Sequence, residues 1–260
     1  MEIPKIIHYC WFGPKPIPKL ELKCMESWSK YFPDYKLMFW NEKTFDIKSN
    51  IFAKQAYENK KYAFVSDCVR ANVLNNYGGI YLDTDVEIRS NFSHLLKGKD
   101  AVLGFETSKF IGTAFMAFVP NQCIIKTFAD YYVDRSFLNK NGDIEITANP
   151  AILASILKKN NIVLNGKEQL INGIHVFKRE LFFPKKIADN KFQITEETLA
   201  IHYFEGSWLT ESQKKRGTNI IWIEVCRPIL RLCKSLIFKI IGEKKAKKFE
   251  IKVRNSSWLR

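Results

Sequence analysis

The stretch that decides the fold reads Tyr77-Gly78-Gly79-Ile80-Tyr81-Leu82-Asp83-Thr84-Asp85-Val86-Glu87-Ile88. Gly78 and Gly79 reach backbone angles that other residues resist, so we expect them to end the preceding helix. The apolar run at 80–82 predicts a buried strand. That strand leads into Asp83 and Asp85, whose carboxylates repel each other unless a cation lies between them.

The two acids predict a metal site, although a plainer alternative exists. Mg²⁺ and Mn²⁺ prefer oxygen ligands, often one or two carboxylates together with phosphate oxygens. Asp-x-Asp alone is common and can be only a polar turn after a strand. The Gly-Gly turn and the strand favour the metal, because open α/β sheets bind ligands at the ends of their strands. An aspartyl phosphatase is disfavoured, because Glu87 stands where its pattern has Thr or Val.

Length and cysteine usage indicate a globular protein of the cytoplasm. The 260 residues allow one large domain or one and a half. The six cysteines are scattered and include no Cys-x-x-Cys pair. Met1 to Lys5 does not resemble a secretory leader. We therefore expect a reducing environment, with neither a disulfide framework nor a zinc site.

The net charge of +14 is concentrated near the C-terminus, where residues 214–260 hold 14 Lys and Arg against 3 Asp and Glu. We expect a nearly neutral domain at 1–213 and a basic extension at 214–260 that meets an anionic surface. Apolar residues with helical spacing predict a cationic amphipathic helix within 227–248. This helix either lies on anionic lipid, peripheral to the inner face of the membrane, or packs on the domain. It carries too many charges to span a bilayer, and no nucleic-acid module is recognised.

The first third of the chain predicts a parallel sheet. A strand at 3–10, a helix at 20–31 and a strand at 35–40 form a βαβ unit, so the sheet is expected to be largely parallel. His8 and Trp11, at the end of the first strand and before a Gly/Pro loop, are candidates for one wall of a base-binding pocket. For His8 a satisfied core position is the favoured alternative.

Two more helices are expected at 52–59 and 62–76. In the second, Asp67 and Arg70 are one turn apart and therefore share a face. They form either a surface ion pair or a pair directed into the cleft, with Asp67 accepting from sugar hydroxyls and Arg70 donating to phosphate or sugar. The second interpretation is favoured because this helix leads directly into the Gly-Gly turn.

The remainder predicts strands at 101–105 and 113–119, helices at 122–137 and 151–159, and a strand with a loop at 177–184. Asn149 before Pro150 is expected to cap a helix. An apolar strand then delivers His202, and a Gly-containing turn presents Ser207 and Trp208. The alternative for this last stretch is a core histidine and a packing tryptophan.

Three segments together resemble one family: residues 3–8, the run Phe64-Val65-Ser66-Asp67-Cys68-Val69-Arg70, and residues 77–85. In this order and spacing they resemble the DXD sugar-binding region of glycosyltransferase family 32. Relatives of that family include yeast initiating mannosyltransferases, bacterial capsular polysaccharide transferases and clostridial glucosylating toxins. The resemblance covers residues 3–88 and the segment near His202.

The resemblance implies a GT-A fold, which is an α/β architecture with a mostly parallel central sheet flanked by helices. It also implies a nucleotide-sugar donor, a Mn²⁺ or Mg²⁺ ion, and transfer with retention at the anomeric carbon. By position, Asp85 would bind the metal directly, and Asp83 would contact the donor or reach the metal through water. Asp67 and Arg70 would hold the donor sugar, and Tyr77 would lie near the nucleotide or have a structural role. Glu106 and Asn149 are placed only loosely.

The family also has a His-x-x-x-x-Ser-Trp stretch that closes over the metal and the diphosphate. By position, His202 or Ser207 would complete the metal shell or reach phosphate, and Trp208 would cover the leaving group. Such loops often order when the donor binds, so their closure can gate turnover.

These observations favour a metal-dependent, retaining glycosyltransferase of surface polysaccharide biosynthesis. It would move a sugar, from a UDP-sugar by preference, to a glycan or a lipid-linked saccharide. Asp83, Asp85 and Arg70 are the candidate catalytic residues, because positive charge beside the leaving diphosphate lowers the barrier. The alternatives are a transferase that acts on protein and a non-catalytic module that binds a sugar nucleotide or a membrane.

Overall fold

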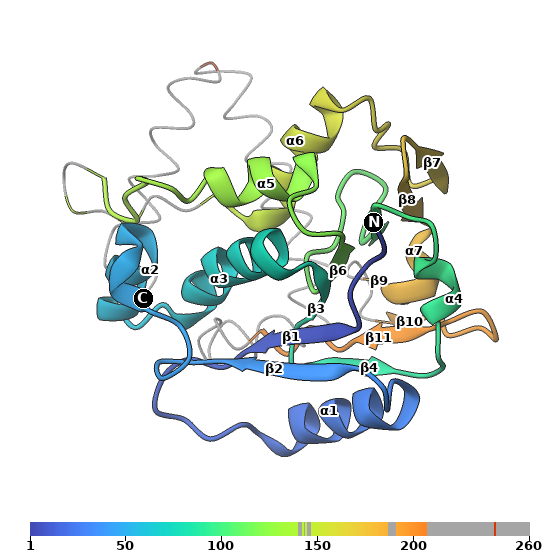
Figure 1. Cartoon of the computed structure of the whole chain (residues 1–260), viewed down its shortest axis with the longest axis horizontal. Helices are drawn as coiled ribbons and strands as arrows, with labels where there is room; N and C mark the ends of the chain where they lie inside the picture. The colour runs from blue at the N-terminus through green and yellow to red at the C-terminus, as the bar shows by residue number, and fades with distance from the viewer. Residues whose placement is uncertain (140–141, 143, 145–146, 187–190, 207–241, 243–260) are drawn as a thin grey trace. The chain divides into compact units, whose positions relative to one another are not determined.

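The computed structural model describes residues 1–139, 142, 144, 147–186, 191–206 and 242 (Figure 1). Apart from Gly242, the helix expected within 227–248 lies outside these residues, as do Ser207, Trp208 and the boundary at 213/214. No helix in the described part of the chain is long and apolar enough to cross a bilayer.

Seven strands form the central sheet in the order β2-β1-β3-β6-β5-β8-β7. β1 pairs in parallel with β2 and β3, and β5 pairs in parallel with β8. β6 is antiparallel to both β3 and β5, and β7 is antiparallel to β8. All strands except β6 and β7 therefore point the same way, which confirms the predicted α/β class with a mostly parallel sheet. The strands are β1 (Ile6–Cys10), β2 (Lys36–Trp40), β3 (Gly79–Leu82), β5 (Ala101–Gly104), β6 (Phe115–Phe118), β7 (Gln169–Ile171) and β8 (Ile174–Phe177).

Helices cover both faces of this sheet (Figure 1). Alternation along β3 separates the two cores, since Tyr81 packs with the helix α3 while Ile80 and Leu82 pack with Trp28 of α1. α3, α5 and α6 pack in series over the first core. The helices are α1 (Lys19–Tyr31), η1 (Ile47–Ser49), α2 (Ile51–Glu58), α3 (Tyr62–Tyr77), α4 (Ser93–Leu96), α5 (Cys123–Asp130), α6 (Asn149–Lys159) and α7 (Arg179–Phe182).

Two strand pairs lie outside the central sheet. β4 (Val86–Ile88) pairs antiparallel with β11 (Ala200–His202), with Val86 opposite His202. β9 (Lys185–Lys186) pairs antiparallel with β10 (Lys191–Phe192). The first pair brings the end of the described chain back to the residues that follow β3.

The Gly-Gly turn joins α3 to β3 as the sequence predicts. Gly78 follows the helix with φ 63°, and its N–H donates to the carbonyl oxygen of Leu74 at 3.0 Å. Gly79 has φ 94°, and a Cβ there would lie 2.7 Å from the carbonyl oxygen of Ile6. Glycine is required at position 79 because β3 passes so close to β1.

Three local predictions were wrong. The helix expected at 122–137 ends at Asp130, and the chain turns through Asp134 at φ 56°. Asn149 is not a cap, because Ala148 occupies that position and the Asn149 side-chain oxygen accepts a hydrogen bond from the hydroxyl of Tyr132. The segment expected as a strand and loop at 177–184 instead contains α7, whose Phe182 is fully buried.

Candidate active site

The carboxyl end of β3 delivers Asp83 and Asp85. The N–H of Asp83 donates to the carbonyl oxygen of Ala114 at 2.9 Å, which continues the pairing with the β6 side of the sheet. The N–H of Val86 donates to the carbonyl oxygen of Asp83 at 3.0 Å and closes a turn. This turn separates β3 from β4, so both acids lie at one end of the sheet.

Arg70 of α3 holds two of the predicted carboxylates. Its Nη2 lies 3.1 Å from Asp67 Oδ1 and 3.0 Å from Asp83 Oδ1, and its Nη1 donates to the carbonyl oxygen of Thr113 at 2.6 Å. Its guanidinium also lies over the ring of Tyr81, with Cζ 4.7 Å from the ring centroid. The predicted shared face of Asp67 and Arg70 is therefore confirmed, with Arg70 buried and Asp67 partly buried.

Burial and the neighbouring charges together set the pKa values of this pair. Burial alone would lower the pKa of Arg70, but the Asp83 and Asp67 carboxylates outweigh it, so the guanidinium stays charged. Burial raises the pKa of Asp67 to about 6, although Arg70 acts to lower it. A carboxyl group with a pKa raised in this way is typical of a functional site, which agrees with the expected role of Asp67 in ligand binding.

Asp85 is contacted by the last residue of β11 and by the residues that follow this strand. Asp85 Oδ1 lies 3.3 Å from Nε2 of His202, and Asp85 Oδ2 accepts from the backbone N–H of Glu205 at 2.9 Å. Burial alone would raise the pKa of Asp85, but the His202 imidazole and the Glu205 N–H hold it below its usual range. Burial alone would lower the pKa of His202, yet Asp85 raises it. The two side chains therefore stabilise each other's charged forms.

Asp83, Asp85 and His202 form a group that fits a metal ion. Each offers one ligand atom, and these atoms all lie within 4.8 Å of one another. Carboxylates and imidazole are both ligands that divalent metal ions accept in proteins. His202 Nδ1 is buried and lacks a hydrogen-bond partner among the described residues, so this imidazole is held through its Nε2 side.

The structure does not bring His8 and Tyr77 to this group. His8 is fully buried in mid-strand, where Nε2 lies 2.8 Å from the carbonyl oxygen of Gly78 and Nδ1 accepts from Trp40 Nε1 at 3.1 Å. Burial lowers the pKa of His8 to about 4. Tyr77 lies before β3, at the opposite end of that strand from Asp83, and its ring packs against those of His8 and Trp40. Both nitrogens of His8 are satisfied by the core.

Trp11 follows the carboxyl end of β1, which is the same end of the sheet as Asp83. It is half-buried, and its Nε1 donates to the carbonyl oxygen of Lys15 at 2.7 Å. Trp11 therefore lies in the loop after β1, and its contact with a base stays a prediction.

Sequence reasoning missed two features of this site and placed a third only loosely. One is the Glu205 N–H, because a backbone contact leaves no pattern in the sequence. Another is Lys185, whose Nζ donates to the carbonyl oxygen of Tyr203 at 2.6 Å, beside the Asp85 contacts. The third is Glu106, placed only loosely from the sequence: burial raises its pKa, and the charges of His202 and Asp83 act on it. A carboxyl residue just after the strand at 101–105 was the one available signal.

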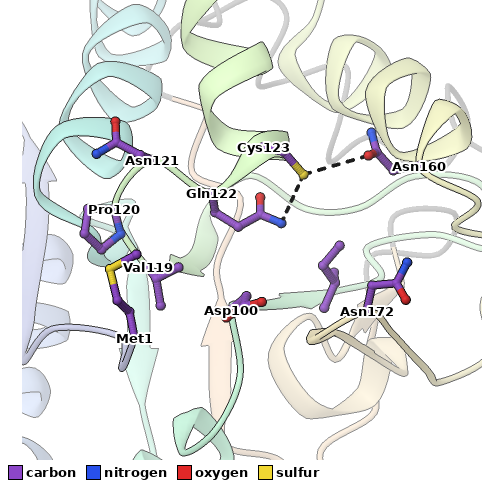
Figure 2. Close-up of a pocket in the computed structure, with 10 residues that line it drawn as sticks. Met1, Asp100, Val119, Pro120, Asn121, Gln122, Cys123, Asn160 and Asn172 are labelled. Carbon is purple, nitrogen blue, oxygen red and sulfur yellow. Dashed lines mark hydrogen bonds between the residues drawn. The ribbon is translucent and has the colours of Figure 1, made fainter.

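A cavity of about 340 Å³ lies elsewhere (Figure 2). Its lining includes Asp100 before β5, Val119 after β6 and Ile174 at the start of β8. These positions mark the opposite end of the sheet from Asp83. Figure 2 shows Cys123, with Gln122 and Asn160 on either side of its thiol. The cavity is therefore separate from the acidic group.

Comparisons with known proteins agree with the resemblance found in the sequence. Residues 18–103 match a family described as a glycosyltransferase sugar-binding region containing a DXD motif. The matched segment contains Asp67, Arg70, Asp83 and Asp85 but ends before Lys185 and His202. The resemblance to DXD glycosyltransferases is thereby confirmed for this third of the chain.

Individual relatives are also glycosyltransferases by name. An uncharacterized glycosyltransferase, L373, of Acanthamoeba polyphaga mimivirus is 35% identical over 36% of this chain and 40% of that protein. Inositol phosphoceramide mannosyltransferase 3 of Schizosaccharomyces pombe is 33% identical over 36% of this chain and 27% of that protein. The solved PaToxG glycosyltransferase has a TM-score of 0.45 and 21% identity, covering 61% of this chain and 69% of that one. The chain spans less than half the length of both curated relatives.

Proposed function

We propose that this chain is a metal-dependent glycosyltransferase that transfers a sugar from a nucleotide-sugar donor to a saccharide or lipid-linked acceptor. One observation carries the proposal: Asp83 is shared between the metal-fitting group with Asp85 and His202 and the ion pair with Arg70. A metal site and a polar sugar site thus meet at one carboxylate. The match over residues 18–103 supports the same conclusion.

The metal would be held by Asp85, Asp83 and His202. A bound Mn²⁺ or Mg²⁺ supplies positive charge against the negative charge that develops on a diphosphate leaving group. The Glu205 N–H orients Asp85 by holding its Oδ2. Ser207 and Trp208, which follow directly in the sequence, stay proposed donor contacts on the resemblance alone.

Asp67 and Arg70 would order the donor sugar. The Asp67 carboxylate accepts from sugar hydroxyls, and the side chain keeps 18% of its surface exposed for that contact. Arg70 is only 5% exposed and is bonded to Asp67, Asp83 and Thr113. Its main role is therefore to position the two carboxylates, and direct contact with the donor is secondary.

The finer points of the proposal rest on the resemblance. We propose retention at the anomeric carbon, a UDP-sugar donor and a role in surface polysaccharide assembly on the cytoplasmic side. The name of the fission yeast relative, which joins a mannose transferase to a phosphoceramide, supports a lipid-linked acceptor. The basic segment 227–248 would bring the enzyme to an anionic membrane. A protein acceptor is the alternative within the same reaction class.

The test is donor hydrolysis, screened over UDP- and GDP-sugars with Mn²⁺ and with EDTA. We expect release of nucleoside diphosphate from one donor, lost on chelation and lost in Asp85→Asn. Asp34→Asn is the matched control, because Asp34 is an exposed carboxylate paired with Lys5 on the surface. The proposed activity would be refuted if the unaltered protein showed no donor hydrolysis and no metal-dependent nucleotide binding.

A further inference from the structure

Lys185 carries a half-buried ammonium group close to the proposed metal ligands. It lies in β9, opposite Phe192 of β10. Its Nζ donates to the carbonyl oxygen of Tyr203 at 2.6 Å and lies 5.2 Å and 5.7 Å from the ring centroids of Phe192 and Phe204. The aromatic rings and the carbonyl fix the position of this charge.

The segment that Lys185 contacts is the one that contacts Asp85. The N–H of Tyr203 donates to the Asp85 carbonyl oxygen at 3.0 Å, and the N–H of Glu205 donates to its carboxylate at 2.9 Å. Residues 203–205 therefore have Asp85 as one neighbour and the Lys185 ammonium as another. The carboxylates of Glu205 and Asp85 both act on that ammonium electrostatically.

Within the part of the chain that the structure describes, the ammonium has no close carboxylate partner of its own. The ion pairs within 4.0 Å among the described residues do not include Lys185. Burial lowers its pKa, which shows that its charge is partly removed from water. Removing part of a cation from water costs free energy, which a hydrogen-bonded anion would offset. An ammonium has three N–H donors, and the Tyr203 carbonyl accounts for one of them.

We infer that Lys185 is a second cationic contact for the diphosphate of the nucleotide-sugar donor, beside the ion held by Asp83, Asp85 and His202. The inference rests on the proposed function and extends it to a residue outside the matched segment. An incoming diphosphate brings the anionic oxygens that the ammonium lacks, and an ammonium–phosphate hydrogen bond is charge-assisted. The Lys185 ammonium thus stabilises the negative charge that develops on the leaving group.

A purely structural role gives a different expectation. Lys185 would then only fix the 203–205 segment, in which Phe204 has the strained value φ 58°. Loss of that support would weaken the binding of every ligand of the site to the same extent and would lower the thermal stability of the protein. If Lys185 contacts the diphosphate, removing its charge should instead weaken the binding of nucleoside diphosphates selectively.

The binding test compares a nucleoside diphosphate with its monophosphate in the presence of Mn²⁺, by calorimetry. The probe is UDP with UMP, or GDP with GMP, whichever diphosphate the unaltered protein binds. Lys185→Met keeps the apolar stem over the rings and removes the charge. We expect diphosphate affinity to fall about 10–100-fold and monophosphate affinity to change less than about threefold. Lys185→Arg should restore most of the diphosphate affinity, and the control Lys178→Met, which alters an exposed lysine paired with Glu197, should change neither.

A second measurement needs no variant. Amine acylation of the unaltered protein is followed by mass spectrometry with and without the diphosphate and Mn²⁺. We expect the diphosphate to slow acylation of Lys185 several-fold and to leave Lys178 unchanged. The inference is overturned if Lys185→Met weakens the binding of both nucleotides equally, or if the diphosphate does not protect Lys185 from acylation. The proposed donor hydrolysis would still stand in either case. A protein that neither hydrolyses a donor nor binds a nucleotide overturns the proposed function and this inference together.

Discussion

Asp85 Oδ1 lies 3.3 Å from Nε2 of His202, because β4 and β11 pair with Val86 opposite His202. This single pairing joins the strand end predicted from the Gly-Gly stretch to a histidine far along the chain. It also completes a group with two carboxylates and one imidazole. The position of His202 therefore depends on the strand pairing, and so does the proposed metal site.

Replacing His202 with alanine should weaken Mn²⁺ binding. Loss of one of three ligands is expected to lower Mn²⁺ affinity at least 10–100-fold, the effect usual even for residues that only support a ligand. Donor hydrolysis should fall by a similar factor at limiting Mn²⁺ and recover partly at high Mn²⁺. Titration of Mn²⁺ by electron paramagnetic resonance measures the affinity directly. His94→Ala, at an exposed histidine of α4, is the control. Unchanged Mn²⁺ affinity in His202→Ala would rule out its role as a ligand.

Replacing Arg70 with methionine should destabilise the fold. The change leaves Asp67 and Asp83 near each other without the cation that lies about 3 Å from both. Breaking a buried ion pair by removing one partner costs about 3–5 kcal/mol. Urea unfolding at neutral pH measures the change in the free energy of unfolding. The control Lys5→Gln removes an exposed pair with Asp34 and should cost less than about 1 kcal/mol.

A second variant tests the cause of that loss. Asp67→Asn added to Arg70→Met removes one of the two stranded carboxylates. The double variant should therefore be more stable than Arg70→Met alone. If the two changes instead add, the loss in Arg70→Met comes from packing against Tyr81 and not from unpaired charge.

The sequence predicted the parts of the site that depend on local patterns. Asp67 and Arg70 share a helix face, and Asp83 and Asp85 follow a strand, so spacing alone brought them to notice. The contacts of Lys185 depend on where β9 lies against residues 203–205, and no local period reports such a long-range arrangement. Tyr77 belonged to the deciding stretch, yet a strand separates it from Asp83, so proximity in sequence did not mean proximity in the site.

His8 should make stability depend on pH. Its pKa is lowered from 6.5 in the unfolded chain to about 4 in the fold, so folding favours the neutral ring. As the pH falls, the unfolded chain binds the proton before the folded chain does. The contribution of His8 to the free energy of unfolding is therefore complete above pH 6.5 and is lost between pH 6.5 and 4. The loss attributable to His8 is about 3 kcal/mol across that window.

The measurement is urea unfolding of the unaltered protein and of His8→Gln at pH 7 and pH 4.5. Carboxylates that titrate in the same range affect both proteins equally, so the difference between them isolates His8. We expect the stability gap between the two proteins to narrow at pH 4.5. A gap that stays constant or widens would show that protonation of His8 in the folded protein does not lower its stability.

Gly79 should be intolerant of a side chain, and Gly98 provides a matched comparison. Both residues have positive φ, 94° and 65°, which alanine adopts only with strain of about 1–2 kcal/mol. At Gly79 a Cβ would also lie 2.7 Å from the Ile6 carbonyl oxygen, whereas nothing lies within 4 Å of a Cβ at Gly98. Gly79→Ala should therefore lower the free energy of unfolding by at least about 1 kcal/mol more than Gly98→Ala. It should also displace β3, and with it Asp83 and Asp85, so Mn²⁺ affinity should fall in Gly79→Ala and not in Gly98→Ala. Equal losses of stability in the two variants would mean that β3 and β1 do not approach each other as closely as the turn requires.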